Sequence, residues 1–157
     1  LFAGTIRDNL MFGCPDATEE QIEEALVISQ AKEFVDTKEG RLDAVVEQGG
    51  KNLSGGQRQR LTLARALVPQ SDILIMDDSA SALDYATDAK LRKAIQNMKR
   101  KPTVFIVSQR TSSIQDADSI LVLDDGKIAG KGTHEELIAS CDIYREIYET
   151  QFKKEEA

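Results

Sequence analysis

Hydrophobic positions change their spacing near Pro69. Before it, apolar residues recur at the three- and four-residue intervals that place them on one face of a helix. After it, short apolar runs alternate with helical segments. The first run, Ile73-Leu74-Ile75-Met76, is typical of a strand buried on both faces. We therefore predict an α/β protein with a helical subdomain at 1–70 and a core of parallel strands and helices at 71–157.

The longest helix of the first part is predicted to begin directly after Ser54 and to end before Pro69, with Leu61, Ala64 and Leu67 on its buried face. A capping box of Thr18 and Gln21 predicts the start of an earlier helix. The remaining predicted elements are a short helix within 1–10, an extended loop at 44–50, helices at 86–99, 133–139 and 143–152, buried strands at 73–76, 103–107 and 120–123, a hairpin strand at 127–129 and a solvated charged tail after 152.

Composition narrows the function classes. With 157 residues, 41% hydrophobic and 30% charged, the chain suits one globular domain or two small subdomains. The net charge of -7 argues against a nucleic-acid surface, which needs a basic stripe. Cys14 and Cys141 match no metal-ligand spacing, so reduced thiols are expected.

No apolar run approaches the length of a membrane span, and no signal peptide is recognisable. We expect a soluble fragment, and the start at Leu1 rather than Met indicates a piece of something longer. Any membrane-spanning part would lie outside these residues.

The segment Leu53-Ser54-Gly55-Gly56-Gln57 has the features of an anion site. Ser54 can cap the following helix, the glycines let a ligand approach the backbone, and the first-turn amides with the helix dipole favour phosphate oxygens. Asp77 and Asp78 follow the first buried strand, at the end where open α/β sheets bind ligands.

These residues resemble motifs of the ATP-binding cassette (ABC) ATPases. Residues 53–57 look like the signature motif, Ile73–Asp77 looks like the Walker B strand, and residues 81–84 look like the D-loop. Residues 1–10 and 132–137 resemble cassettes of the exporter type. The resemblance implies a partial RecA-like P-loop NTPase core joined to a helical signature subdomain.

The resemblance also implies roles for single residues. Ser54, Gly55, Gly56 and Gln57 would contact the terminal phosphate of an ATP bound to a second cassette, because cassettes of this family sandwich nucleotide head to tail. Asp77 would hold Mg2+ through water, although a turn residue at a strand end is the simpler alternative. Asp84 would pass between the two cassettes, and it is equally an N-cap for the next helix.

Two positions depart from the family pattern. The acid after Asp77 is normally Glu and here is Asp78, whose carboxylate is withdrawn by about 1.5 Å, one carbon–carbon bond. The residue after the strand at 103–107 that is normally His is here Gln109, which can donate to phosphate but cannot carry a proton charge. Both changes weaken hydrolysis. The pair resembles the degenerate half of a heterodimeric bacterial multidrug exporter.

The family also needs a phosphate-cradling loop of the form G-x-x-x-x-G-K-S/T, and these residues contain none. We therefore expect ATP and Mg2+ to bind only in a complete domain or dimer, and the fragment alone to be inactive. The expected partners are a second nucleotide-binding domain and a transmembrane domain, with the cassette at the cytoplasmic face of the cell membrane.

Two other functions remain open. The chain could belong to a regulatory module that closes on ATP and supplies no hydrolysis of its own. A cassette protein of translation or DNA repair, without a transport role, is disfavoured by the exporter-like segments and by the acidic charge.

Overall fold

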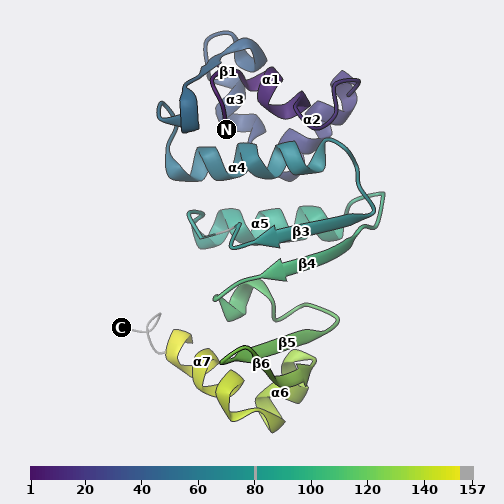
Figure 1. Cartoon of the computed structure of the whole chain (residues 1–157), viewed down its shortest axis with the longest axis vertical. Coiled ribbons are helices and arrows are strands. Elements are labelled where there is room, and N and C mark those ends of the chain that lie inside the picture. Colours follow the sequence, from purple (N-terminus) through teal and green to yellow (C-terminus); the bar gives the residue numbers. More distant parts are fainter. Residues whose placement is uncertain (80, 153–157) are drawn as a thin grey trace. The chain divides into compact units, whose positions relative to one another are not determined.

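The computed structural model describes residues 1–79 and 81–152, and the chain divides into two compact units, Leu1–Val107 and Ser108–Ala157 (Figure 1). The predicted α/β class is confirmed, whereas the division into subdomains 1–70 and 71–157 stays a prediction. The tail predicted after residue 152 lies outside the described residues.

The elements of the first unit are β1 Gly4–Thr5, α1 Ile6–Met11, α2 Glu19–Ile28, α3 Lys32–Asp36, η1 Arg41–Asp43, β2 Val45–Val46, η2 Gln48–Gly50, α4 Gly55–Leu67, β3 Ile73–Asp77, α5 Tyr85–Gln96 and β4 Thr103–Val107. Those of the second are η3 Thr111–Ser113, β5 Ile120–Asp124, β6 Lys127–Gly132, α6 His134–Ser140 and α7 Asp142–Phe152.

Helix α4 is the central element of the first unit. It lies between the N-terminal helices and α5 (Figure 1), and its predicted apolar face is buried. Arg60 joins this helix to its neighbours. Its Nη1 donates to the carbonyl of Gln30 at 2.8 Å, and its guanidinium lies 4.9 Å from the ring centroid of Phe34. Helix α4 is therefore held in place by its packing against the neighbouring helices.

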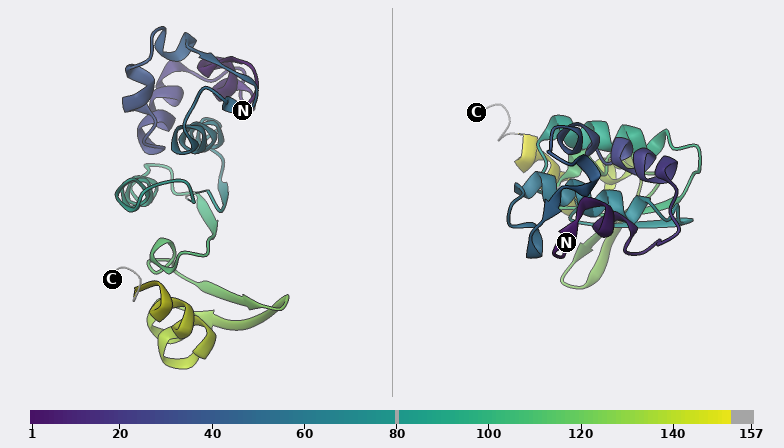
Figure 2. Two further views of the ribbon diagram at one scale, coloured as in Figure 1. Left: turned by 90° about the vertical axis from the view of Figure 1, so that its left-hand side faces the viewer. Right: turned by 90° about the horizontal axis from the view of Figure 1, so that it is seen from above.

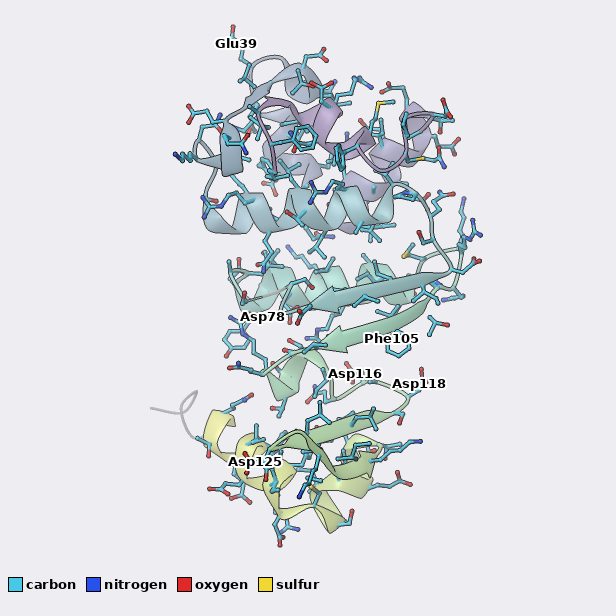
Figure 3. All side chains as sticks on the ribbon, in the orientation of Figure 1. Glu39, Asp78, Phe105, Asp116, Asp118 and Asp125 are labelled. Carbon is cyan, nitrogen blue, oxygen red and sulfur yellow. The ribbon has the colours of Figure 1, made fainter. Side chains whose placement is uncertain are left out.

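Strands β3 and β4 pair in parallel, with Ile73 opposite Thr103 and Asp77 opposite Val107. Helix α5 lies on one side of the pair (Figure 2). On the other face, Ile75 is 69% and Phe105 57% exposed, and the Phe105 ring points away from α5 (Figure 3). The prediction that the strand at 73–76 is buried on both faces is therefore wrong, and the strand at 103–107, predicted to be buried, is only partly so. Among the described residues only one face has a cover, so exposure alternates along each strand.

The second unit is a hairpin covered by two helices. Asp125 and Gly126 both have positive φ, 45° and 74°, as a type I′ turn between antiparallel β5 and β6 requires. The predicted hairpin strand and the helix predicted at 133–139 are confirmed, and a capping box of Thr133 and Glu136 begins α6. Tyr144 of α7 is 2% exposed and packs in the apolar cluster of this unit.

Both cysteines are free, as predicted. No helix within the described residues is both long and apolar enough to cross a membrane.

Candidate functional site

The first turn of α4 is closed by a reciprocal capping box. Ser54 is the N-cap in an extended conformation, and its Oγ accepts from the N–H of Gln57 at 3.2 Å. The Gln57 side chain returns the contact, its Oε1 accepting from the N–H of Ser54 at 3.1 Å. The prediction that Ser54 caps this helix is confirmed.

The capping box leaves the amides of Gly55 and Gly56 for another acceptor. A helix has four N–H groups at its start without intrahelical partners, from the N-cap to the third helical residue. The box satisfies those of Ser54 and Gln57. The N–H groups of Gly55 and Gly56 remain. These residues have no side chains that could shield them, and the N–H groups lie at the positive end of the helix dipole. This turn is chemically suited to hold an anion.

The same turn packs closely against the residues that precede α5. A Cβ built at Gly56 would lie 3.3 Å from the carbonyl oxygen of Ala82. One built at Gly55 would lie 3.7 Å from the Ala82 Cβ, an ordinary contact. A side chain at position 56 would thus require the Ala82 carbonyl to give way by a few tenths of an ångström, whereas one at position 55 would not.

Gln59 ties α4 to the loop that follows β3. Its Nε2 donates to the Asp78 carbonyl at 3.1 Å and to Ser81 Oγ at 3.3 Å, while its Oε1 accepts from the N–H of Ala82 at 2.9 Å. One side chain thereby joins two motifs that are separate in the sequence. Gln59 could not be recognised as a connecting residue from the sequence, because a polar residue inside a helix gives no local signal of a partner 19 to 23 residues away.

Asp77 is the last residue of β3. Asp78 follows it at the carboxyl end of the strand (Figure 3). Asp78 has a positive φ of 46°, which Asp tolerates better than most residues, and its N–H donates to the carbonyl of Val107 at 2.9 Å. Both side chains are exposed. The described residues contain no group of three or more acidic, His or Cys side chains able to hold a metal. One or two carboxylates suit Mg2+, which keeps water and phosphate ligands.

Asp84 caps α5, as predicted. Its Oδ1 accepts from the N–H of Thr87 at 2.8 Å, and its Oδ2 from the Thr87 hydroxyl at 2.9 Å. These two bonds, the backbone one first, hold the pKa of the Asp84 carboxyl below its ordinary value. Because the folded-state pKa is depressed, the cap's contribution is fully present above the ordinary, unfolded-state pKa of the Asp84 carboxyl and is lost as the pH falls through the lower folded-state pKa.

Gln109 lies near the start of the second unit, two residues before η3. It is exposed, and its carbonyl accepts a 2.6 Å hydrogen bond from Nε2 of Gln151. Next to it, the N–H of Arg110 donates to Ser108 Oγ at 3.0 Å. Gln151, on the last helix, is a second glutamine, after Gln59, whose distant partner the sequence gives no sign of.

Comparison with known proteins gives this arrangement a family. A family model described as "ABC transporter" matches residues 2–81. An uncharacterized ABC transporter ATP-binding protein of Mycobacterium tuberculosis is 46% identical over 96% of this chain and 26% of its own. The ATP-dependent lipid A-core flippase of Shewanella frigidimarina is 41% identical over 98% of this chain and 26% of its own.

A solved structure shares the fold. A bacterial Atm1-family ABC exporter with ATP bound superposes with a TM-score of 0.92 at 32% identity, over 96% of this chain and 27% of the exporter chain. The chain therefore spans about a quarter of the length of the relatives that it matches.

The spacing at the start of α4 predicts different outcomes for two neighbouring substitutions. Gly55→Ala should stabilise a complete ATP-binding domain by about 0.5 kcal/mol, because Ala restricts the unfolded chain and its Cβ makes only an ordinary contact with Ala82. Gly56→Ala should destabilise it by about 1 to 2 kcal/mol, because the Ala82 carbonyl must move. Chemical unfolding of both variants measures the difference, and equal effects would contradict the close approach at Gly56.

Proposed function

The chain belongs to the ABC transporter family, and from this premise we propose that it is the later part of an exporter's ATP-binding domain. In this proposal the domain closes on ATP together with a second such domain, and closure drives a membrane domain. Several relatives support the exporter assignment, among them a lipid A-core flippase and a probable multidrug resistance ATP-binding/permease protein of Bacillus subtilis, 41% identical over 96% of this chain and 26% of its own.

The observation that carries the proposal is the pair of uncapped glycine amides at the start of α4. We infer that Gly55 and Gly56 bind the terminal phosphate of an ATP held mainly by the second domain, with Ser54 and Gln57 beside them. The chain itself contains no G-x-x-x-x-G-K-S/T loop, so the loop that cradles the phosphates comes from outside these residues. A helix start supplies the complementary half, two N–H donors and a positive dipole end.

The acids after β3 serve the nucleotide on this chain's own side. Asp77 would hold Mg2+ through water, and the bound ion would neutralise charge on the phosphates. Asp84 lies in the loop that Gln59 fixes against α4, which supports its passage between the two domains. In this way one loop connects the two nucleotide sites.

Asp78 and Gln109 make this side a weak hydrolytic site. The Asp78 carboxylate ends about 1.5 Å short of the Glu that the family uses, and a misplacement of about 1 Å costs on the order of a hundredfold in rate. Gln109 can donate a hydrogen bond to phosphate but cannot take up a proton. We infer a heterodimer in which this site retains ATP and the partner's site hydrolyses it.

A second candidate function follows from the same two residues. If neither site of the assembly uses this chain for hydrolysis, the domain is an ATP-dependent regulatory module that closes without chemistry. Turnover at the site completed by Gly55 and Gly56 distinguishes the two functions, because only an exporter ATPase hydrolyses ATP there.

The capping box permits a test that separates helix stability from phosphate binding. Asp caps helices as well as Ser does, so Ser54→Asp should leave the melting temperature of the complete transporter unchanged. Its carboxylate would face phosphate, however, and ATPase activity should fall about a hundredfold, equivalent to roughly 2.7 kcal/mol. Ser54→Ala is the matched control, with a weaker cap and no added charge. Full activity of Ser54→Asp would rule out phosphate binding at this turn.

The degenerate site makes a second prediction. In the complete transporter, the double variant Asp78→Glu with Gln109→His should raise hydrolysis at this site by about tenfold to a hundredfold, because it restores the reach of the carboxylate and a side chain that carries a proton. Single-turnover measurements with labelled ATP resolve the two sites. Asp78→Asn with Gln109→His is the control without a carboxylate. An unchanged rate in the first variant would show that these residues do not limit hydrolysis.

A further inference from the structure

One side chain of the last helix holds the loop that carries Gln109. Gln151, in the final turn of α7, donates from Nε2 to the Gln109 carbonyl at 2.6 Å. Its Oε1 accepts from the N–H of Thr111 at 2.9 Å and from the Thr111 hydroxyl at 3.0 Å. The amide is thus used at both ends, and only one orientation gives its oxygen two donors and its nitrogen an acceptor. The contacts join residues 40 and 42 positions apart.

Gln109 depends on its backbone for its position. Among the described residues its side-chain amide makes no hydrogen bond, and the residue is exposed. Its carbonyl is held by Gln151, and the next residues form a tight turn in which the N–H of Ser113 donates to the Arg110 carbonyl at 3.1 Å. Thr111, inside this turn, is only 3% exposed. The direction of the Gln109 side chain is therefore set by a backbone that Gln151 grips on both sides of Arg110.

The other end of α7 is firmly docked. Tyr144 is buried in the apolar cluster with Ile120 and Leu137, and Arg145 Nε donates to the Ile138 carbonyl at 2.8 Å. These contacts fix the first turns of α7 on the hairpin and α6. Helix α7 therefore connects the core of this unit to the loop at residues 109–111.

We propose that Gln151 is a positioning residue that holds Gln109 in the orientation in which it donates to the phosphate of bound ATP. This inference rests on the role proposed above for Gln109 and adds a residue far from the phosphate. Gln151 touches no reacting atom. It acts only through the backbone of residues 109–111.

The test uses the complete transporter and the release of labelled ATP from the site of Asp78 and Gln109. Gln151→Met keeps the length of the side chain and removes the amide. We expect it to speed release about tenfold, the effect of losing one strong hydrogen bond to the nucleotide. Gln109→Ala should give the same increase, and the double variant no more than either alone. Thr150→Ala, an exposed neighbour on α7, is the matched control and should leave release unchanged.

A structural measurement accompanies the kinetics. Hydrogen exchange of a peptide spanning residues 109–113 should speed up in Gln151→Met, because the Thr111 N–H loses its acceptor. Gln151→Glu separates the two halves of the contact and serves if the Met variant does not fold. Its carboxylate still accepts from Thr111 but repels the Gln109 carbonyl, so protection of Thr111 should persist while ATP release is still faster.

The outcomes are distinct. Unchanged release in Gln151→Met and Gln151→Glu, with faster release in Gln109→Ala, overturns the positioning role alone. Additive effects in the double variant overturn it as well, because they show that Gln151 acts independently of Gln109. If Gln109→Ala itself leaves release unchanged, the proposed role of Gln109 fails, and the inference built on it fails too.

Discussion

The site depends on how the first turn of α4 satisfies its backbone amides. Every helix begins with N–H groups that need acceptors from outside the helix. Here Ser54 and Gln57 supply acceptors for two of them and leave the glycine amides between them uncovered. A turn with all four amides capped would have nothing to offer a phosphate, and one with none capped would be a less stable helix start. The two outer positions of the turn therefore stabilise the helix start, and the two inner positions keep N–H groups that an anion could use.

Two glutamines hold the two loops that follow β3 and β4. Each of them contacts residues that are far from it in the sequence. Gln59 fixes the loop between β3 and α5, and Gln151 fixes the loop after β4. An amide side chain suits this task because it carries a donor and an acceptor together. It can therefore pair with a backbone carbonyl and a backbone N–H at once, without adding charge. A carboxylate or an ammonium in either place would leave a carbonyl or an N–H without its partner.

The parallel pair β3 and β4 delivers the acids. Parallel pairing in register aligns the carboxyl ends of both strands, so Asp77 lies opposite Val107 and the loops that follow begin at the same edge. The N–H of Asp78 extends the ladder by one further bond to Val107. This contact fixes the backbone of Asp78 directly. The length of the Asp78 side chain then sets how far its carboxylate reaches.

Where helices begin and where the hairpin turns can be predicted from the sequence, because capping boxes and the turn at Asp125–Gly126 depend on residues within three positions of each other. It also identified the α/β class and the chemical features of residues 53–57, since motif spacing is local. Three features could be seen only in the folded chain: the covered face of β3, the short β1–β2 pair that joins Gly4 to Val46, and the partners of Gln59 and Gln151. A run of apolar residues does not specify what packs on each side of it. A hydrogen bond between residues 19 or 40 positions apart forms only when the chain folds.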